Sequence, residues 1–181
     1  KRGLTNVNNV PEALNAYKRP EAVRMFSKLG VLNERELNGR VEVEYEKFVM
    51  KLQIESRVLG DIAINHIVPT AIQYQTTLLK NVRNIKKVFP EEEFEQLAGA
   101  RMELIKEIGG HISAIKAKCK DMTEARKRAN VKENIVEKAE LYDQTVKPYL
   151  DDIRYHIDKL ELIIDNELWP LPKYRELLFV R

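Results

Sequence analysis

The stretch that decides the fold runs from residue 33 to residue 89 and reads NERELNGRVEVEYEKFVMKLQIESRVLGDIAINHIVPTAIQYQTTLLKNVRNIKKVF. Asn33 and Glu36 have the spacing of a capping box at a helix start. Apolar residues then recur every three or four positions, and only Pro69 interrupts the run. The stretch therefore predicts one helix of about 55 residues, roughly 80 Å long. Its apolar positions are Val41, Tyr45, Phe48, Leu52, Leu59, Ile62, Ile67 and Leu78.

A helix this long needs equally long partners to cover its apolar side. After the turn at Phe89-Pro90, a second helix is predicted from Glu91 to about Arg128, and a third from near Lys132 to about Asn166. Short connections make such neighbours antiparallel. The second apolar stripe is Phe94, Leu97, Leu104, Ile105, Ile108, Ile112, Ile115, Cys119 and Met122; the third is Ile135, Ala139, Tyr142, Val146, Tyr149, Ile153, Ile157, Leu160 and Ile164.

The two ends of the chain have a different character. Residues 1–32 predict a loop and two short helices, one capped by Asn9 with Pro11 in its first turn, the other opened by Pro20 and ended by Gly30. Residues 169–181 begin Trp-Pro-Leu-Pro and predict an extended tail with no partner within this chain. The predicted fold class is all-α: a long antiparallel bundle of three long helices over residues 33–168, two short N-terminal helices and an extended C-terminal tail.

Composition narrows the function classes. The 181 residues carry a net charge of +3, too small to require nucleic acid or an acidic membrane as partner. A single cysteine fits a reducing compartment, and no apolar run reaches the length of a membrane span, so a cytoplasmic protein is expected. The chain starts with Lys1-Arg2-Gly3 rather than Met, which suggests a piece of a longer protein.

The sequence offers no catalytic, cofactor-binding or metal-binding residue. The nearest approaches to a metal motif, Glu107 with His111 and Asp152 with His156, have a spacing of four and lack the required Glu-x-x-His pair. Gly109-Gly110 has no flanking phosphate-loop pattern. Cys119 lies on an apolar stripe, where a cysteine is usually a small hydrophobic side chain.

A basic run near the end of the second helix admits two interpretations, nucleic-acid contact or a complement to the helix dipole. The second is favoured because the same helix opens with Glu91, Glu92 and Glu93. Acidic residues after the turn would then face the basic end. The run comprises Lys116, Lys118, Lys120, Arg126, Lys127 and Arg128, and the facing acids are Glu133, Glu137 and Glu140.

The three histidines sit on or beside apolar stripes. Counted from the Phe89-Pro90 turn, His66 and His111 would lie at similar heights on antiparallel helices, with His156 offset by roughly two turns. A buried polar layer or a pH-sensitive contact is one hypothesis. The alternative is a set of boundary histidines, each bonded to a carboxylate or a carbonyl.

Three helix breakers have a regular spacing. Pro69 and Gly109-Gly110 each lie about 20 residues from the Phe89-Pro90 turn, and Pro148 lies about 18 residues after the turn near Asn130. On antiparallel helices all three fall in one layer, close to His66, His111 and Tyr149. The spacing predicts a bend or a looser region there.

Several segments resemble one enzyme family. NVNNVPEALNAY (residues 6–17) followed by EAVRMFSKLGVLNERELNGRVEVEYEKF (residues 21–48) resembles the region after the catalytic residues in glutamine synthetases. KLQIESRVLGDIAINHIVPTAIQY (residues 51–74) and ELWPLPKYRELLFV (residues 167–180) are similar to the type III members. The resemblance covers the whole chain and is sequence-wide rather than a catalytic fingerprint.

The resemblance implies that the full-length enzyme joins ammonia to glutamate with ATP and divalent metal ions such as Mg²⁺, in a large ring-shaped homo-oligomer. The glutamate- and nucleotide-binding motifs of the family lie upstream, and none is found in residues 1–181. This chain would be a C-terminal helical accessory or assembly domain, inactive alone, with the upstream catalytic domain and neighbouring subunits as partners. The alternative is a free-standing helical interaction module; neither nucleic acid nor a membrane is an expected partner.

Overall fold

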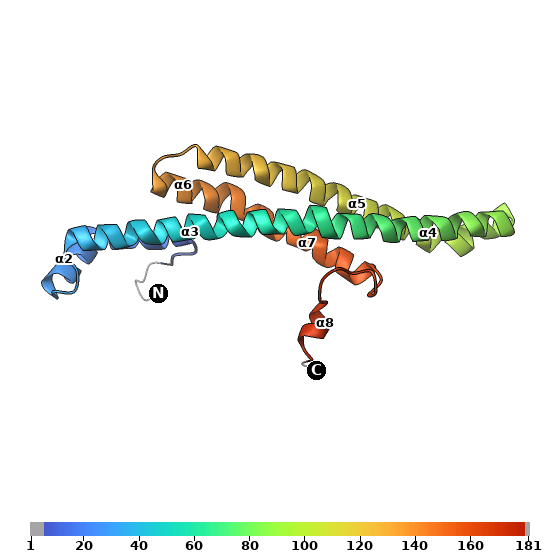
Figure 1. The fold of residues 1–181 in the computed structure, drawn as a ribbon, viewed down its shortest axis with the longest axis horizontal. Helices are drawn as coiled ribbons and strands as arrows, with labels where there is room; N and C mark the ends of the chain where they lie inside the picture. Colours follow the sequence, from blue (N-terminus) through green and yellow to red (C-terminus); the bar gives the residue numbers. More distant parts are fainter. Residues whose placement is uncertain (1–5, 180–181) are drawn as a thin grey trace. The chain divides into compact units, whose positions relative to one another are not determined.

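The computed structural model describes residues 6–179, with the backbone alone at positions 174 and 175; residues 1–5 of the expected loop and 180–181 of the expected tail lie outside the described residues. Every regular element in this part of the chain is helical, as predicted (Figure 1). The chain forms two compact units: unit 1 is Lys1–Arg57 with Met122–Leu150, and unit 2 is Val58–Asp121 with Asp151–Arg181. The elements are α1 (Val10–Tyr17), α2 (Pro20–Lys28), α3 (Glu34–Ile62), η1 (Ala63–Ile67), α4 (Val68–Val88), α5 (Glu91–Asn130), α6 (Ile135–Leu141), η2 (Tyr142–Val146), α7 (Lys147–Ile163) and α8 (Tyr174–Leu177).

The predicted starts of α1 and α3 are confirmed by their caps. The Asn9 side chain accepts a hydrogen bond of 2.8 Å from the Glu12 backbone N–H at the start of α1. At α3, the Asn33 side chain accepts a hydrogen bond from the Glu36 backbone N–H, and the Glu36 carboxylate accepts one from the Asn33 backbone N–H, each at 2.9 Å. Together they form a complete capping box. Such caps satisfy backbone donors that have no partner inside the helix.

Unit 1 is held by an apolar stripe on α3 and by polar ties to the α5–α6 turn. Gln53 donates to the Asn130 side-chain oxygen at 2.8 Å, and the buried Tyr142 donates its hydroxyl to the same oxygen at 2.7 Å. The spacing of three or four residues keeps one side of α3 on the core. The buried positions of this unit include Leu37, Val41, Tyr45, Val49, Leu52, Ser56, Met122, Ala125, Ala129, Ala139, Tyr142 and Val146.

Unit 2 contains the antiparallel hairpin of α4 and α5, joined at Phe89-Pro90 as predicted. The Gln75 side chain crosses from α4 and donates to the Ile105 carbonyl at 2.8 Å. Residues 75 and 105 are almost equally far from the turn, as an antiparallel pair requires. The buried positions of this unit include Ala63, Ile67, Val68, Ala71, Ala98, Ile108, Ile115, Cys119, Ile153, Ile157, Leu160, Ile164 and Trp169.

Both helix-interior prolines follow a π-helical turn. η1 ends two residues before Pro69, and η2 ends two residues before Pro148. Proline has no N–H and its ring crowds the carbonyl four residues back, which a wider turn accommodates. The residue before each proline donates to the carbonyl five residues back, Val68 to Ala63 and Lys147 to Tyr142. The backbone is therefore locally irregular at both prolines, and the bend or looser region expected there stays a prediction.

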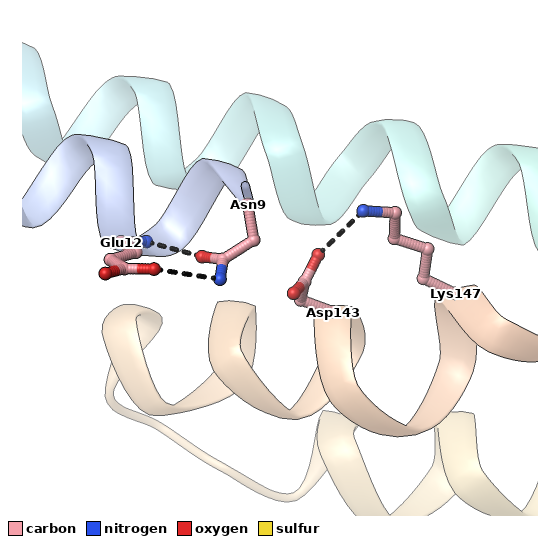
Figure 2. A network of polar contacts seen from close by, with 4 residues as sticks. All are labelled: Asn9, Glu12, Asp143 and Lys147. Carbon is pink, nitrogen blue, oxygen red and sulfur yellow. Dashed lines mark hydrogen bonds and ion pairs between the residues drawn. The ribbon is translucent and has the colours of Figure 1, made fainter. Parts of the chain in front are cut away.

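Figure 2 shows how side chains flank the second π turn. Lys147 and Asp143 form an ion pair of 3.1 Å across η2, and the Asp143 side chain is only 15% exposed. The Asn9–Glu12 cap of α1 lies in the same part of unit 1 (Figure 2). This proximity agrees with the contact between α1 and α6.

At Gly109-Gly110 the backbone shows no such π turn, because α5 is α-helical through both glycines. Glycine weakens a helix through backbone entropy, yet it neither removes a hydrogen bond nor causes a clash. Gly109 instead makes room for a neighbour: a Cβ there would lie 3.3 Å from Gln75 Nε2. The absent side chain thus lets Gln75 reach the backbone of α5.

The third helical stretch begins later than predicted. It starts at Ile135 rather than near Lys132, because the Asn134 side chain accepts from the backbone N–H groups of Val136 and Glu137 at 2.9 and 3.3 Å. A short polar side chain that accepts these bonds fixes the helix start. The stretch ends at Ile163 instead of about Asn166.

The tail is not wholly extended and does find a partner within its unit, in contrast to the prediction. Trp169 and Lys173 are buried, and α8 follows. Lys173 donates its ammonium to the carbonyls of Glu161 (2.6 Å) and Ile164 (2.9 Å), at the C-terminal end of α7. A cation is favourable there because the last carbonyls of a helix lack partners and carry the negative end of its dipole.

Candidate functional site

A groove with both apolar and charged lining opens in unit 1 where α1 and α2 meet the first turns of α3. Its volume is about 860 Å³. The side chains of Arg40, Glu44 and Lys47 line one side and supply both signs of charge. Large concave apolar surfaces with a few charged groups are typical of places that receive another molecule or another part of the same protein. The apolar lining is Leu14, Tyr17, Phe26, Leu32, Leu37, Val41 and Val43.

Contacts of Tyr45 hold α1 against α3, and a ring contact joins α2 to α1, so that together they shape the groove. The buried Tyr45 hydroxyl donates to the Pro11 carbonyl at 3.0 Å and lies 2.8 Å from the Asn15 side-chain oxygen. Burial raises the pKa of Tyr45, and the nearby Glu140 carboxylate raises it further, so the hydroxyl keeps its proton. Tyr17 and Phe26 stack with ring centroids 6.2 Å apart, which joins α1 to α2.

A second groove of about 430 Å³ adjoins the first. Leu14, Glu44 and Lys47 line both, so the two grooves share an edge formed by α1 and α3. Other apolar side chains are exposed on α2 and on the turn that follows it. They include Met25 (50% exposed), Leu29 (68%) and Val31 (60%).

The histidine contact differs from the predicted one. His111 meets His156 rather than His66: the two Nδ1 atoms are 2.9 Å apart, whereas His66 is exposed on η1. The predicted offset of His156 was too large because the third stretch begins at Ile135. Counted from the observed helix ends, His111 lies 19 residues before Asn130 (130 − 111) and His156 lies 21 residues after Ile135 (156 − 135).

The other residues singled out in the sequence have neighbours consistent with structural roles. The His111 Nε2 atom is 3.9 Å from a Glu107 carboxylate oxygen, and Asp152 is paired with Lys118 at 2.6 Å. Within residues 6–179 no three side chains of His, Cys, Asp or Glu gather as metal ligands would. Burial raises the pKa of Cys119 to about 11, which keeps it a neutral thiol.

Two members of the basic run make ion pairs. Lys118 is paired with Asp152 of α7, and Lys127 is paired with Glu124 one turn earlier at 2.7 Å. Of the acids expected to face the basic run, Glu137 lies 3.1 Å from Lys132, which belongs to the turn between α5 and α6 and not to the run. Exposed pairs of this kind contribute about 0–1 kcal/mol each.

Sequence reasoning missed the groove and the role of Lys173. The groove depends on how α1 and α2 turn back on α3, and no local pattern fixes that geometry. Buried lysines are rare, so a lysine in a polar-looking tail gives no sign of burial. One signal was present: Glu176 follows Lys173 by three residues, and its carboxylate accepts from the Lys173 N–H at 3.2 Å.

Known proteins match the chain over its whole length. A glutamine synthetase of Bacteroides fragilis is 58% identical over 181 residues, all of this chain and 25% of that protein. The sequence model described as "Glutamine synthetase C-terminal domain" matches residues 1–86. Residues 1–86 thus match the glutamine synthetase C-terminal domain, and the whole chain is similar to a quarter of a glutamine synthetase.

More distant relatives align just as fully. A type-3 glutamine synthetase of Dictyostelium discoideum is 28% identical over 190 residues, which cover 99% of this chain and 24% of that protein. A glutamine synthetase of Butyrivibrio fibrisolvens is 22% identical over 179 residues, 99% of this chain and 25% of that protein. The chain thus spans about a quarter of the length of the relatives it matches. No helix within residues 6–179 has the length and apolar character needed to cross a membrane.

Proposed function

We propose that this chain is an accessory and assembly domain of a glutamine synthetase, an enzyme that ligates ammonia to glutamate with ATP. Catalysis would be carried by the upstream part of the same polypeptide, which would also hold ATP and Mg²⁺. The domain itself would be inactive and would help the full-length protein assemble as a homo-oligomer in the cytoplasm. The relatives support this assignment, since each is named a glutamine synthetase and is about four times longer than the match.

The groove of unit 1 is the observation that carries the proposal. A space of about 860 Å³ lined by Leu14, Tyr17, Phe26 and Val43 leaves apolar surface open to solvent. Removing apolar surface from water stabilises a contact by about 25 cal/mol per Å². The occupant we propose is the catalytic part of the same polypeptide, which the relatives' additional length provides.

Substitution at the groove tests the proposal in the full-length enzyme. Val43 lines the groove and is 45% exposed, so Val43→Lys should fold normally while placing a charge where the partner would pack. We expect light scattering to show a loss of full-size particles and a parallel loss of glutamine formation. Val131→Lys is the matched control, because Val131 is 80% exposed in the turn after α5 and lines neither groove.

Three results would count against the proposal. Wild-type assembly and activity of Val43→Lys would remove the groove as a docking site. An equal loss of assembly in the Val131→Lys control would make the effect one of surface charge alone. Glutamine formation by the purified 181-residue chain would contradict the non-catalytic role.

A further inference from the structure

One polar contact between α5 and α7 in unit 2 involves two titratable rings. His111 and His156 face each other with their Nδ1 atoms 2.9 Å apart and their ring centroids 5.2 Å apart. Both side chains are partly withdrawn from solvent, and that of His111 is 14% exposed. A hydrogen bond between two histidine nitrogens can form only in some protonation states.

The chemistry of the imidazole ring defines those states. A hydrogen bond between two Nδ1 atoms needs a proton on one and a lone pair on the other. The contact therefore forms when both rings are neutral with complementary tautomers, or when one ring is protonated and the other is neutral. When both rings are protonated, two N–H groups and two positive charges face each other at hydrogen-bond distance, and the contact is repulsive.

Charged groups of both signs lie near the two rings. On α5, the Glu107 carboxylate lies 3.9 Å from Nε2 of His111, so the outer side of that ring faces a negative charge. Lys118 of α5 is bonded to Asp152 of α7 at 2.6 Å. The Tyr155 ring packs edge-on against His156 with centroids 5.2 Å apart, and it offers no charge.

We propose that His111 and His156 form a proton-operated clasp between α5 and α7. The clasp is closed when both rings are neutral or when only one of them is protonated. Protonation of the second ring places N–H groups on both facing nitrogens, which opens the clasp and loosens α7 on α5 within unit 2. The device would make this part of the protein less stable at mildly acidic pH.

The direction of the pH dependence follows from His156. Burial lowers its pKa below the ordinary value of 6.5, His111 and Lys118 lower it further, and Asp152 opposes them. The unfolded chain therefore binds a proton at His156 more readily than the folded chain does. The stabilising contribution is complete above the ordinary pKa and is lost as the pH falls through it towards the lowered value.

Hydrogen exchange of the 181-residue chain provides the test. Between about pH 7.5 and pH 5.5, the range in which histidine titrates, we expect opening around residues 108–114 and 153–159 to increase roughly tenfold after correction for intrinsic exchange. In His156→Asn the increase should vanish, because the Asn amide reproduces the Nδ1 position without titrating. The matched control is His66→Asn, which removes an exposed histidine and should keep the wild-type response.

A second measurement keeps the proposal falsifiable if a variant fails to fold. Imidazole ¹⁵N shifts of the wild type should show one protonated and one bare Nδ1 near neutral pH. Two bare Nδ1 atoms near neutral pH would overturn the clasp. An equal pH response in His156→Asn and the wild type would overturn it as well.

Discussion

Two adjacent glycines in α5 differ in what surrounds them. Nothing lies within 4 Å of a Cβ built on Gly110, whereas a Cβ on Gly109 would lie 3.3 Å from Gln75 Nε2. Alanine is favoured over glycine in a helix interior by about 1 kcal/mol. We expect Gly110→Ala to raise the free energy of unfolding by roughly 0.5–1 kcal/mol in urea denaturation.

Gly109→Ala should gain less than Gly110→Ala, or lose stability, because the new methyl group displaces the Gln75 amide from the Ile105 carbonyl. The pair of variants is internally controlled, since both make the same chemical change one residue apart. Equal stabilisation by the two would show that the Gln75 contact contributes nothing.

Lys173 is another residue whose effect depends on its partners. Its ammonium is buried and donates to the Glu161 and Ile164 carbonyls. Lys173→Met keeps the apolar stem but leaves those carbonyls without their donor. We expect a loss of about 1.5–3 kcal/mol in the free energy of unfolding, the usual range for hydrogen bonds to charged groups. Lys106→Met, at an exposed position of α5, should change it by less than about 0.5 kcal/mol.

At the scale of elements, the π turns should be the weak points of the long helical stretches. Amide exchange should show faster opening in η1 (63–67) and η2 (142–146) than one turn to either side. The reason is that their hydrogen bonds join residues five positions apart, which interrupts the regular α-helical pattern. Residues 106–111 around the glycine pair should exchange slowly, as in the rest of α5. Uniform protection along all three segments would contradict this expectation.

The helices themselves could be predicted from sequence, and their relative register could not. Apolar periodicity and the caps at Asn9 and Asn33 located the main elements, because these signals are local. The histidine contact depended on where the third stretch begins, and a difference of three residues at Asn134 moves every later side chain by about 4.5 Å along the axis. Helix boundaries are the least certain part of such predictions, so a contact counted from a turn inherits their error.

The groove and the contact of the tail could not be predicted from local sequence patterns, for a related reason. The groove forms because Tyr45 reaches the α1 backbone from α3, a contact between residues 34 positions apart. The tail was expected to be extended, yet Lys173 finds the end of α7. Both depend on tertiary contacts that periodicity does not encode. The chemistry of the tail's apolar end was easier to predict, since Leu177, Leu178 and Phe179 are exposed.

At the scale of the whole molecule, those last residues are expected to contact the rest of the enzyme. Leu177, Leu178 and Phe179 are 68%, 60% and 75% exposed, a cluster of apolar side chains at one end of the chain. Ending the chain at Glu176 removes them and leaves Lys173 in place. We expect the thermal midpoint of the 181-residue chain to change by less than about 2 °C, while assembly of the full-length enzyme decreases.

Leu162→Ser is the control for this truncation, because Leu162 is an equally bare apolar side chain, 82% exposed on α7. Particle size by light scattering should be unaffected in that variant. Normal assembly of the truncated enzyme would remove the tail from the set of contacts.

The extra residue in each π turn is needed because a proline follows it. A π turn holds one residue more than the α-helical turn it replaces, so it absorbs an insertion without rotating the helix beyond it. Deleting the exposed Ile64 alone would restore α-helical spacing but force the ring of Pro69 against the backbone, at a cost of about 3 kcal/mol. Deleting Ile64 together with Pro69→Ala removes the extra residue and the reason for it. The shortened helix would then present the same faces before and after the deletion site. The deletion of Ile64 alone is therefore expected to lower the free energy of unfolding, whereas the deletion together with Pro69→Ala is expected to leave it unchanged.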